Sequence, residues 1–209
     1  MWLILQSDKG LSSPRLAEAL GVSQPTAWRI GHAVRLMLAQ DKPLDGMVEA
    51  DISYLGGLPR HHADDPRPGR GRKGQRRTTK ASMLGLVERP ADLTPGAPAG
   101  EVRVRTVPSG SNVEIGRMFE TTISPDAHLI SDEAKAFVAI GTAFPAHDTV
   151  CHKDRIYVRG TVHTNGADGL ADRIRRTVLG VFHHISPAHA DLYLDEIAWR
   201  WSQRYVTGR

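Results

Sequence analysis

Apolar and polar residues alternate over residues 47–54, which predicts a β-strand with two unlike faces. The apolar face would carry Val48, Ala50, Ile52 and Tyr54. The polar face would carry Glu49, Asp51 and Ser53, and Gly56 with Gly57 ends the run as a turn signal. Two interpretations of the polar face are open. It is either the solvent face of a half-buried strand, which is the common arrangement, or it places Asp51 to hold a metal ion.

Other stretches extend this pattern into a series of strands and helices. The predicted strands cover residues 47–54, 81–88, 101–107 and 128–131, and the predicted helices cover about 112–122 and much of 164–205. Asp132 stands at the end of the last strand, directly before another helix. The buried stripe of the final helix would be Ala190, Leu194, Ile197, Ala198, Trp201 and Tyr205. We therefore expect an α/β domain over residues 46–205, preceded by a small all-α segment over residues 1–40.

The all-α segment reads as two short helices. Ser13 with Pro14 can begin the first, Gly21 makes a turn, and Ser23 caps the second. The exposed side of the second helix would show Gln24, Thr26, Arg29, His32 and Arg35. This arrangement is typical of a helix-turn-helix, whose second helix lies in the major groove. An ordinary helical hairpin is the alternative. Because the exposed side holds no acidic residue, we favour DNA binding through Gln24, Thr26, Arg29 and Arg35.

Composition limits the classes of protein to which the chain can belong. Its 209 residues, 40% of them hydrophobic, suffice for one substantial domain and a small additional segment. No apolar run approaches the roughly 20 residues that cross a bilayer, and no signal peptide opens the sequence. A single cysteine, Cys151, excludes an internal disulfide framework and a cysteine-rich zinc ribbon. We expect a cytoplasmic protein without membrane contact.

Positive charge is concentrated in one segment, the basic loop of residues 60–80. The net charge of the chain is +4, and this loop holds eight Lys and Arg residues against two Asp residues. Such a segment suits a polyanion, because each neutralised phosphate releases condensed counterions. The candidate DNA contacts here are Arg70, Arg72, Lys73, Arg76 and Arg77. The alternative is a loop that only increases solubility.

The order of the predicted elements is that of a ribonuclease-H-like core with a mixed sheet and flanking helices. In such a core the first strand carries one acid, an adjacent strand carries a second, and a C-terminal helix supplies a third group. These acids hold two Mg²⁺ ions about 4 Å apart for phosphodiester displacement, and Mg²⁺ prefers oxygen ligands. Asp51 and Asp132 fit the first two positions. On a helical wheel Asp168, Asp172 and Arg175 share one face, opposite an apolar stripe.

Each of these acids has a simpler interpretation that stays open. Asp132 could only cap the helix that follows it, which is a common use of Asp. Asn165 could cap the later helix, with Asp168 completing a capping box. Asp168, Asp172 and Arg175 could form a surface ion pair that contributes little.

Several blocks of the sequence resemble those of one known family. The blocks are "VEADISYLGG", "LISDEAKAF", "VHTNGADGLADRIRRTVLGVFHHIS" and "HADLYLDEIAWRWSQR". In this order they look like blocks of the ISXO-like DDE transposases of bacterial insertion sequences. The "TAW" with its following basic helix is similar to the helix-turn-helix that precedes the family's catalytic domain. The likeness covers most of residues 10–204.

The resemblance implies an insertion-sequence transposase with a ribonuclease-H-like fold, dependent on two Mg²⁺ or Mn²⁺ ions. Water would first free a 3′-hydroxyl at the end of the element, and that hydroxyl would then attack target DNA. Asp51 matches the family's first acid and Asp132 its second. The family's asparagine, glutamate and lysine fall at Asn165, Asp168 and Arg175. We therefore expect three metal-binding carboxylates, two further catalytic residues, and a homo-oligomer on double-stranded DNA.

Two departures from the family pattern leave other functions open. Asp168 is one methylene shorter than glutamate, and Arg175 keeps the charge of lysine while changing its donor geometry. The family usually also carries an N-terminal zinc-ribbon region, which this sequence lacks, so a truncated copy is one expectation. The alternatives are a catalytically decayed remnant that acts only as a DNA-binding protein, and a nuclease of the same fold.

Overall fold

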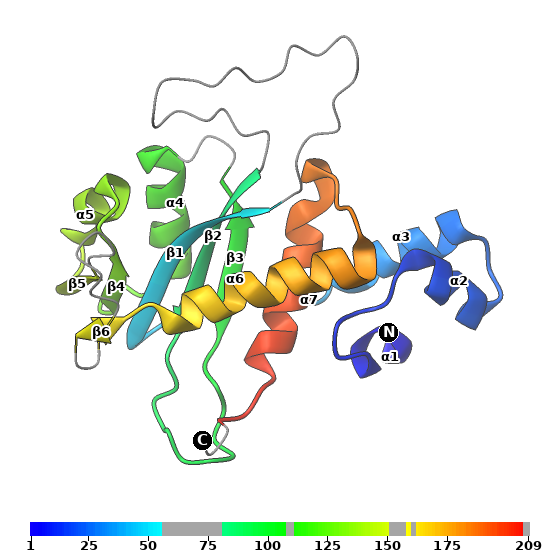
Figure 1. Ribbon diagram of the computed structural model, residues 1–209, viewed down its shortest axis with the longest axis horizontal. Helices are drawn as coiled ribbons and strands as arrows, with labels where there is room; N and C mark the ends of the chain where they lie inside the picture. Colours follow the sequence, from blue (N-terminus) through cyan, green and yellow to red (C-terminus); the bar gives the residue numbers. More distant parts are fainter. Residues whose placement is uncertain (56–80, 108–110, 151–157, 160–161, 207–209) are drawn as a thin grey trace, which may run out of the picture.

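Five strands form one mixed sheet at the centre of the molecule (Figure 1). The computed structural model describes residues 1–55, 81–107, 111–150, 158–159 and 162–206. The strands are β1 (Met47–Leu55), β2 (Ala81–Glu88), β3 (Val102–Thr106), β4 (His128–Asp132) and β5 (Ala146–Val150). Their order is β3-β2-β1-β4-β5. The first three strands are antiparallel, whereas β4 runs parallel to β1 and β5 parallel to β4. This is the ribonuclease-H-like topology, so the predicted fold class is confirmed.

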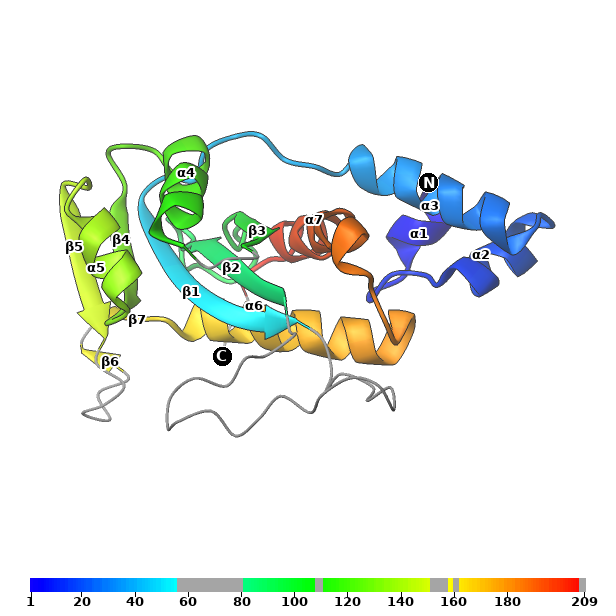
Figure 2. The ribbon, with the colours of Figure 1, turned by 90° about the horizontal axis from the view of Figure 1, so that it is seen from above.

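Helices cover both faces of the sheet and extend beyond it on one side. They are α1 (Trp2–Gln6), α2 (Ser13–Leu20), α3 (Gln24–Leu36), α4 (Asn112–Thr122), α5 (Lys135–Gly141), α6 (Asn165–Thr177) and α7 (Ala190–Ser202). Shorter elements are the β6 (Val158–Arg159) and β7 (Val162–His163) hairpin, a π-helical turn at Val178–Phe182 and a 3₁₀ turn at Pro187–His189. In Figure 2, α4 and α6 lie on opposite sides of β1. No helix in the described ranges is both long and apolar enough to pass through a bilayer.

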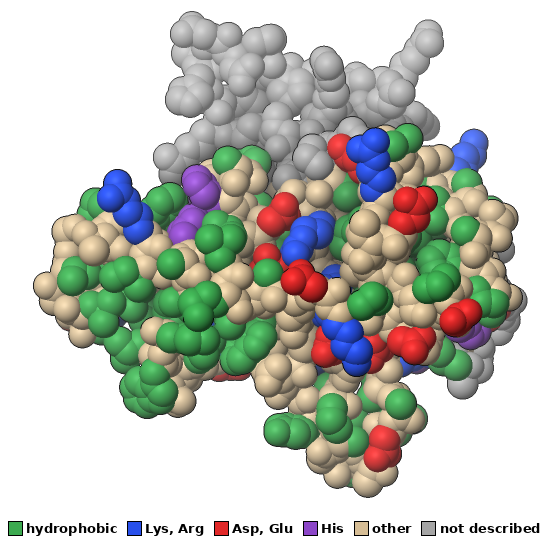
Figure 3. Space-filling view, turned by 180° about the vertical axis from the view of Figure 1, so that it is seen from behind, with side chains coloured by type: hydrophobic (Ala, Val, Ile, Leu, Met, Phe, Trp, Pro, Cys, Tyr) green, Lys and Arg blue, Asp and Glu red, His purple; other side chains and the backbone are tan. Residues whose placement is uncertain are grey.

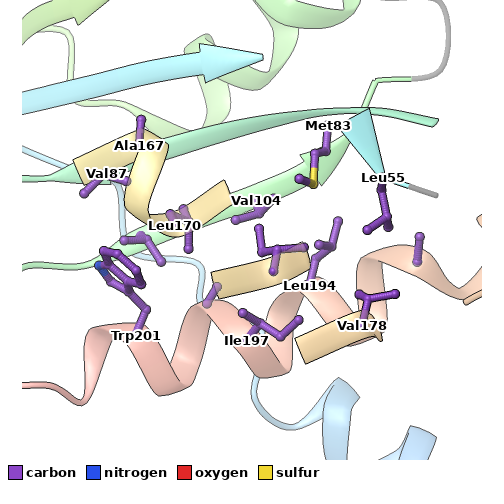
Figure 4. Packing of buried hydrophobic residues seen from close by; sticks show 14 of the residues in the cluster. Leu55, Met83, Val87, Val104, Ala167, Leu170, Val178, Leu194, Ile197 and Trp201 are labelled. Carbon is purple, nitrogen blue, oxygen red and sulfur yellow. The ribbon is translucent and has the colours of Figure 1, made fainter. Parts of the chain in front are cut away.

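Side-chain alternation along each strand divides the core into two halves. One face of the sheet packs Val48, Ala50, Leu84 and Leu86 against α4 and α5. The other face packs Met83, Val87, Val102 and Val104 against α6 and α7 (Figure 4). Because successive residues of a strand point to opposite faces, Glu49 and Asp51 belong to the half beneath α6 and α7.

The polar face of β1 is therefore not a solvent face. Glu49, which lies two residues before Asp51, is only 1% exposed. The interpretation of β1 as a half-buried strand with an acidic solvent face is wrong at this position. Glu49 is buried by tertiary packing, because α6 and α7 lie on that face of the sheet.

The three N-terminal helices have a small core of their own, formed by Ile4, Leu16, Ala27, Val34 and Leu38. Ser23 caps α3 by accepting a hydrogen bond from the Thr26 N–H, and Gly21 ends α2 in the left-handed conformation at φ 65°. The structure thus contains the two short helices predicted here, joined by a turn at Gly21. The first helix begins one residue earlier than expected, with Ser12 at its N-cap.

A buried charge network joins these helices to α7. The Arg35 Nε donates to Glu196 at 2.7 Å, and Arg200 donates to the other oxygen of Glu196 at 2.7 Å. The Arg35 guanidinium also lies 4.0 Å from the centre of the Tyr193 ring. Arg200 further donates to the Ile4 carbonyl at 2.6 Å. The network thereby fixes α1 and α3 against the C-terminal helix.

This network corrects the expected exposed side of α3. Arg35 is 3% exposed and His32 is 8% exposed, so neither lies on a surface that DNA could reach. Burial, together with the nearby Arg35 charge, lowers the pKa of His32. Tyr205 shows the opposite error. We expected it in the buried stripe of the last helix, but it lies beyond the end of α7 and is 67% exposed. Arg35 is therefore not a candidate DNA contact, which corrects the expectation from the sequence.

We expect Arg35→Met to destabilise the protein by about 3–5 kcal/mol, because it leaves the Glu196 carboxylate buried with one partner fewer. Equilibrium unfolding in urea measures the change. Arg15→Met is the matched control, because Arg15 forms an ion pair with Glu18 in which both side chains are 74% exposed, and such pairs contribute little. Equal effects of the two substitutions would contradict a structural role for the buried pair.

Candidate active site

Asp51 and Asp132 lie next to each other on neighbouring strands. The parallel register of β1 and β4 pairs Glu49 with Ile130 and Ala50 with Ser131, so the next position aligns Asp51 with Asp132. Both carboxylates lie on the sheet face that carries Glu49 and Ile130, because side chains alternate. Both residues are partly buried. The sequence separates these two acids by 80 positions, and the parallel pairing brings them to one place.

Asp132 also has a local structural role. Its Oδ1 accepts the Ala134 N–H at 2.9 Å, in the turn before α5, while Ala134 itself is the N-cap residue of that helix. The capping interpretation is thus partly right, because Asp132 stabilises the approach to the helix without being its cap. One oxygen in this bond does not prevent the carboxylate from binding a cation.

Helix α6 lies over β1 and β2 and brings Asp168 to the same half of the molecule. Leu170 packs above Gly85, the residue that pairs with Asp51 across β1 and β2. Gly169 faces Trp201 of α7, and α7 packs against β3. On the helix Asp168 is rotated by about 160° from the sheet-facing Leu170, so it lies on the outer side of α6, on the face of Asp172 and Arg175. Asp168 is exposed.

The capping-box interpretation of Asn165 and Asp168 is wrong. Asn165 is the first residue of α6, the N-cap is Thr164, and no side chain of the helix itself caps it. The capping acceptor comes from the sheet instead. The Glu49 Oε2 accepts the Gly166 N–H at 2.7 Å and the Ala167 N–H at 3.1 Å.

The surface ion-pair interpretation holds for two of its three residues. Arg175 donates to Asp172 at 3.0 Å, and both side chains are about half exposed. Asp168 takes no part in this pair. Arg175, at the position of the family's lysine, is therefore held by its neighbour on the outer side of α6.

Glu49 is a buried acid beside the candidate site whose contacts the sequence interpretation missed. Besides the two helix amides, it accepts the Arg89 Nε at 2.6 Å, and His163 Nδ1 lies 3.4 Å from the same oxygen. Arg89 also donates to the His163 carbonyl at 2.7 Å. We call Glu49, Arg89 and His163 the Glu49 cluster. The available signal was the presence of two acids, two residues apart, on one face of a strand.

The donors at this site fit a hard cation. Asp51 and Asp132 supply only oxygen atoms, and Mg²⁺ is usually held by one or two carboxylates together with water and phosphate. Within the described ranges no group of three or more His, Cys, Asp or Glu side chains is arranged to hold a metal ion. The pair therefore forms the core of the candidate site, and in the described residues Asp168 does not complete a set of three with it.

The candidate DNA-contacting residues differ in how well the structure presents them. Gln24, Thr26 and Arg29 are exposed on α3. Gln24 donates to Ser13 at 2.7 Å, and Thr26 lies 2.9 Å from the Ser23 hydroxyl, so both also stabilise the turn. The five cations of the basic loop, Arg70, Arg72, Lys73, Arg76 and Arg77, lie outside the described residues.

The far end of α3 has a different surface. Leu36 is 64% exposed and Met37 is 68% exposed. In Figure 3, hydrophobic side chains gather over the N-terminal helices, whereas acidic and basic side chains mix over the sheet. The exposed polar residues Gln24, Thr26 and Arg29 therefore lie in the N-terminal half of α3, away from this apolar surface.

Comparison with known proteins gives one family and a distant structural likeness. A family model described as the ISXO2-like transposase domain matches residues 43–202. A chain in the cryo-electron microscopy structure of the simian T-cell lymphotropic virus intasome in complex with PP2A regulatory subunit B56 gamma is similar at 12% identity, with a TM-score of 0.36. The match covers 90% of this chain and 61% of that chain. No curated protein matches.

We expect Mg²⁺ to raise the melting temperature of the protein, because a ligand at ten times its Kd stabilises the folded state by about 1.4 kcal/mol. Asp51→Asn and Asp132→Asn should abolish the increase, and Asp168→Asn should reduce it less. Differential scanning calorimetry across a Mg²⁺ series measures this. The exposed Asp126→Asn is the control. An increase that survives in both Asp51→Asn and Asp132→Asn would rule out the pair as the metal site.

Proposed function

The chain belongs to the family of ISXO2-like transposase domains, and from this premise we propose that it cleaves double-stranded DNA and joins the cut end to a target, using Mg²⁺ or Mn²⁺. The observation that carries the proposal is the alignment of Asp51 and Asp132 on parallel strands. A pair of carboxylates on the central strands of a ribonuclease-H-like sheet suits phosphodiester chemistry, because rigid strands hold both acids at a fixed separation.

In this proposal Asp51 and Asp132 hold the divalent ions between them. When bound, such ions supply Lewis acidity at the attacking and leaving oxygens of an in-line displacement. The two carboxylates are kept in place by different means. Asp51 lies within the β1–β2 ladder opposite Gly85, and Asp132 is held through its bond to the Ala134 N–H. Fixed positions matter because small displacements of reacting groups cost large factors in rate.

Helix α6 supplies the remaining polar groups in the proposal. Asp168 would be the third carboxylate, and it is exposed on α6. Asn165 is exposed at the start of the helix, where its amide can donate to a phosphate oxygen. Arg175, ten residues further along α6, would contact the DNA backbone. Its pair with Asp172 is half exposed, so exchange of that partner for a phosphate costs little.

DNA would be held by polar and positively charged side chains on two separate segments. Gln24, Thr26 and Arg29 lie in the first turns of α3, where the second helix of a helix-turn-helix meets base edges. The cations of the basic loop would bind phosphates without regard to sequence. We expect a homo-oligomer on the DNA.

Nicking of supercoiled plasmid in Mg²⁺ tests the proposed function. We expect cleavage by the wild type and a decrease of about 10³-fold in Asp51→Asn and Asp132→Asn, because each loses a charged oxygen ligand. Asn at position 132 can still accept the Ala134 N–H, so folding is retained. Asp126→Asn should cleave normally.

The remaining outcomes separate the alternatives. Mg²⁺-independent DNA binding without any nicking would identify a decayed remnant. Nicking without transfer of a pre-cut 3′ end to target DNA would identify a nuclease. Cleavage at the wild-type rate in both Asp→Asn variants would reject the metal-site assignment.

We expect Arg29→Ala to weaken DNA binding by about 1–3 kcal/mol, as for loss of one base-reading arginine. Fluorescence anisotropy with a labelled duplex, measured over a range of salt concentrations, gives the affinity. Arg15→Ala is the control, since Arg15 is also an exposed arginine, on α2. If both variants bind like the wild type, α3 does not read DNA.

A further inference from the structure

Glu49 accepts hydrogen bonds from two parts of the chain that are far apart in sequence. Its Oε2 accepts two amides of the first turn of α6, and its Oε1 accepts the Arg89 Nε at 2.6 Å. Arg89 follows β2, and His163 ends β7, directly before α6. The carboxylate is thus the point at which β1, the end of β2 and the start of α6 meet.

This arrangement satisfies a buried charge almost completely. The Glu49 side chain is 2% exposed, and that of Arg89 is 16% exposed. The first N–H groups of a helix have no partner inside the helix, and the helix dipole favours a negative charge there. A carboxylate from the sheet therefore both caps α6 and neutralises Arg89, so removal of its charge affects the helix and the strand together.

Close contact at this point requires a glycine. A Cβ atom at Gly166 would lie 2.8 Å from the Glu49 Oε2 and 3.2 Å from the Val87 side chain. A side chain there would require the Glu49 carboxylate, the Val87 side chain or the first turn of α6 to shift. The sequence "TNGAD" thus allows the helix to begin in direct contact with β1.

The contact sets the position of α6 relative to the candidate active site. On β1, Glu49 lies two residues before Asp51 on the same face, and on α6 the bonded Gly166 lies one residue after Asn165 and two before Asp168. A movement of the helix start would therefore displace Asn165 and Asp168 relative to Asp51. Leu170 and Ile174 also pack against the sheet. Apolar contacts have no preferred direction, so they fix the position of a helix along a sheet less sharply than hydrogen bonds do.

We propose that Glu49, held by Arg89 and His163, is a positioning residue for the reaction. It fixes the start of α6 relative to β1, and thereby fixes the positions of Asn165 and Asp168 relative to Asp51 and Asp132. The inference rests on the proposed function. Glu49 itself does not bind metal here, because both of its oxygens are occupied by helix amides and Arg89.

The test compares Glu49→Gln with Glu101→Gln in the full chain. Glu101 is a matched control, because it pairs with the buried Arg103 at 2.7 Å beside β3 and has no bond to α6. Amide hydrogen exchange followed by NMR should show the Gly166 and Ala167 amides of Glu49→Gln exchanging roughly tenfold faster. Amides of β2 should stay protected. Plasmid cleavage should fall roughly tenfold or more, while the Kd for DNA stays within about twofold of the wild type.

Each outcome decides between the inference and the function on which it rests. Unchanged exchange at Gly166 and Ala167 would show that Glu49 does not hold the start of α6. Faster exchange with an unchanged cleavage rate would refute the positioning role. Should Glu49→Gln fail to fold, Arg89→Met serves in its place, since it removes the neutralising partner and leaves the carboxylate. Absence of cleavage by the wild type would overturn the proposed function, and the exchange measurement would still decide whether Glu49 holds α6.

Discussion

The parallel pairing of β1 with β4 is the constraint on which the candidate active site depends. It is formed by residues 47–50 against 128–131, and it alone places Asp51 beside Asp132. Side chains alternate along a strand, so a slip of one residue would send one of the two acids to the opposite face. Both faces of β4 contribute apolar residues to the core, because Leu129 packs toward α4 and Ile130 packs toward β7. The core packing of the sheet therefore also determines the chemistry available at its edge.

Much of this could be predicted from the sequence, because the signals were local. The alternation over residues 47–54 and the apolar run before Asp132 are short-range patterns, and both strands lie where they were expected. β5 escaped prediction, because "AHDTV" is short, partly exposed and carries no apolar alternation. It forms a strand only because β4 offers a partner at its edge.

The errors share a different physical cause. Arg35 was placed on an exposed helical face, and Glu49 was compatible with a solvent-facing strand, yet both are buried. Their partners lie at Glu196 and at the start of α6, more than 100 residues away along the chain. Periodicity reports how one element divides into faces. It does not report which polar face a distant element will cover. A charged residue that is buried and paired with an opposite charge therefore has the same local sequence pattern as an exposed one.

Two of the buried carboxylates, Glu49 and Glu196, lie where a helix joins the rest of the molecule. Glu49 connects α6 to β1, and Glu196 connects α3 to α7. Ion pairs of this kind add little net stability compared with apolar packing, since desolvation offsets most of their attraction. Unlike apolar packing, they are directional, because an arginine fork and a helix amide can donate to a carboxylate in only one position. A helix that slides by one turn keeps much of its apolar contact and loses every one of these bonds. The two carboxylates therefore act on position more than on stability, and they do so at the two helices that would carry the catalytic and the DNA-reading side chains.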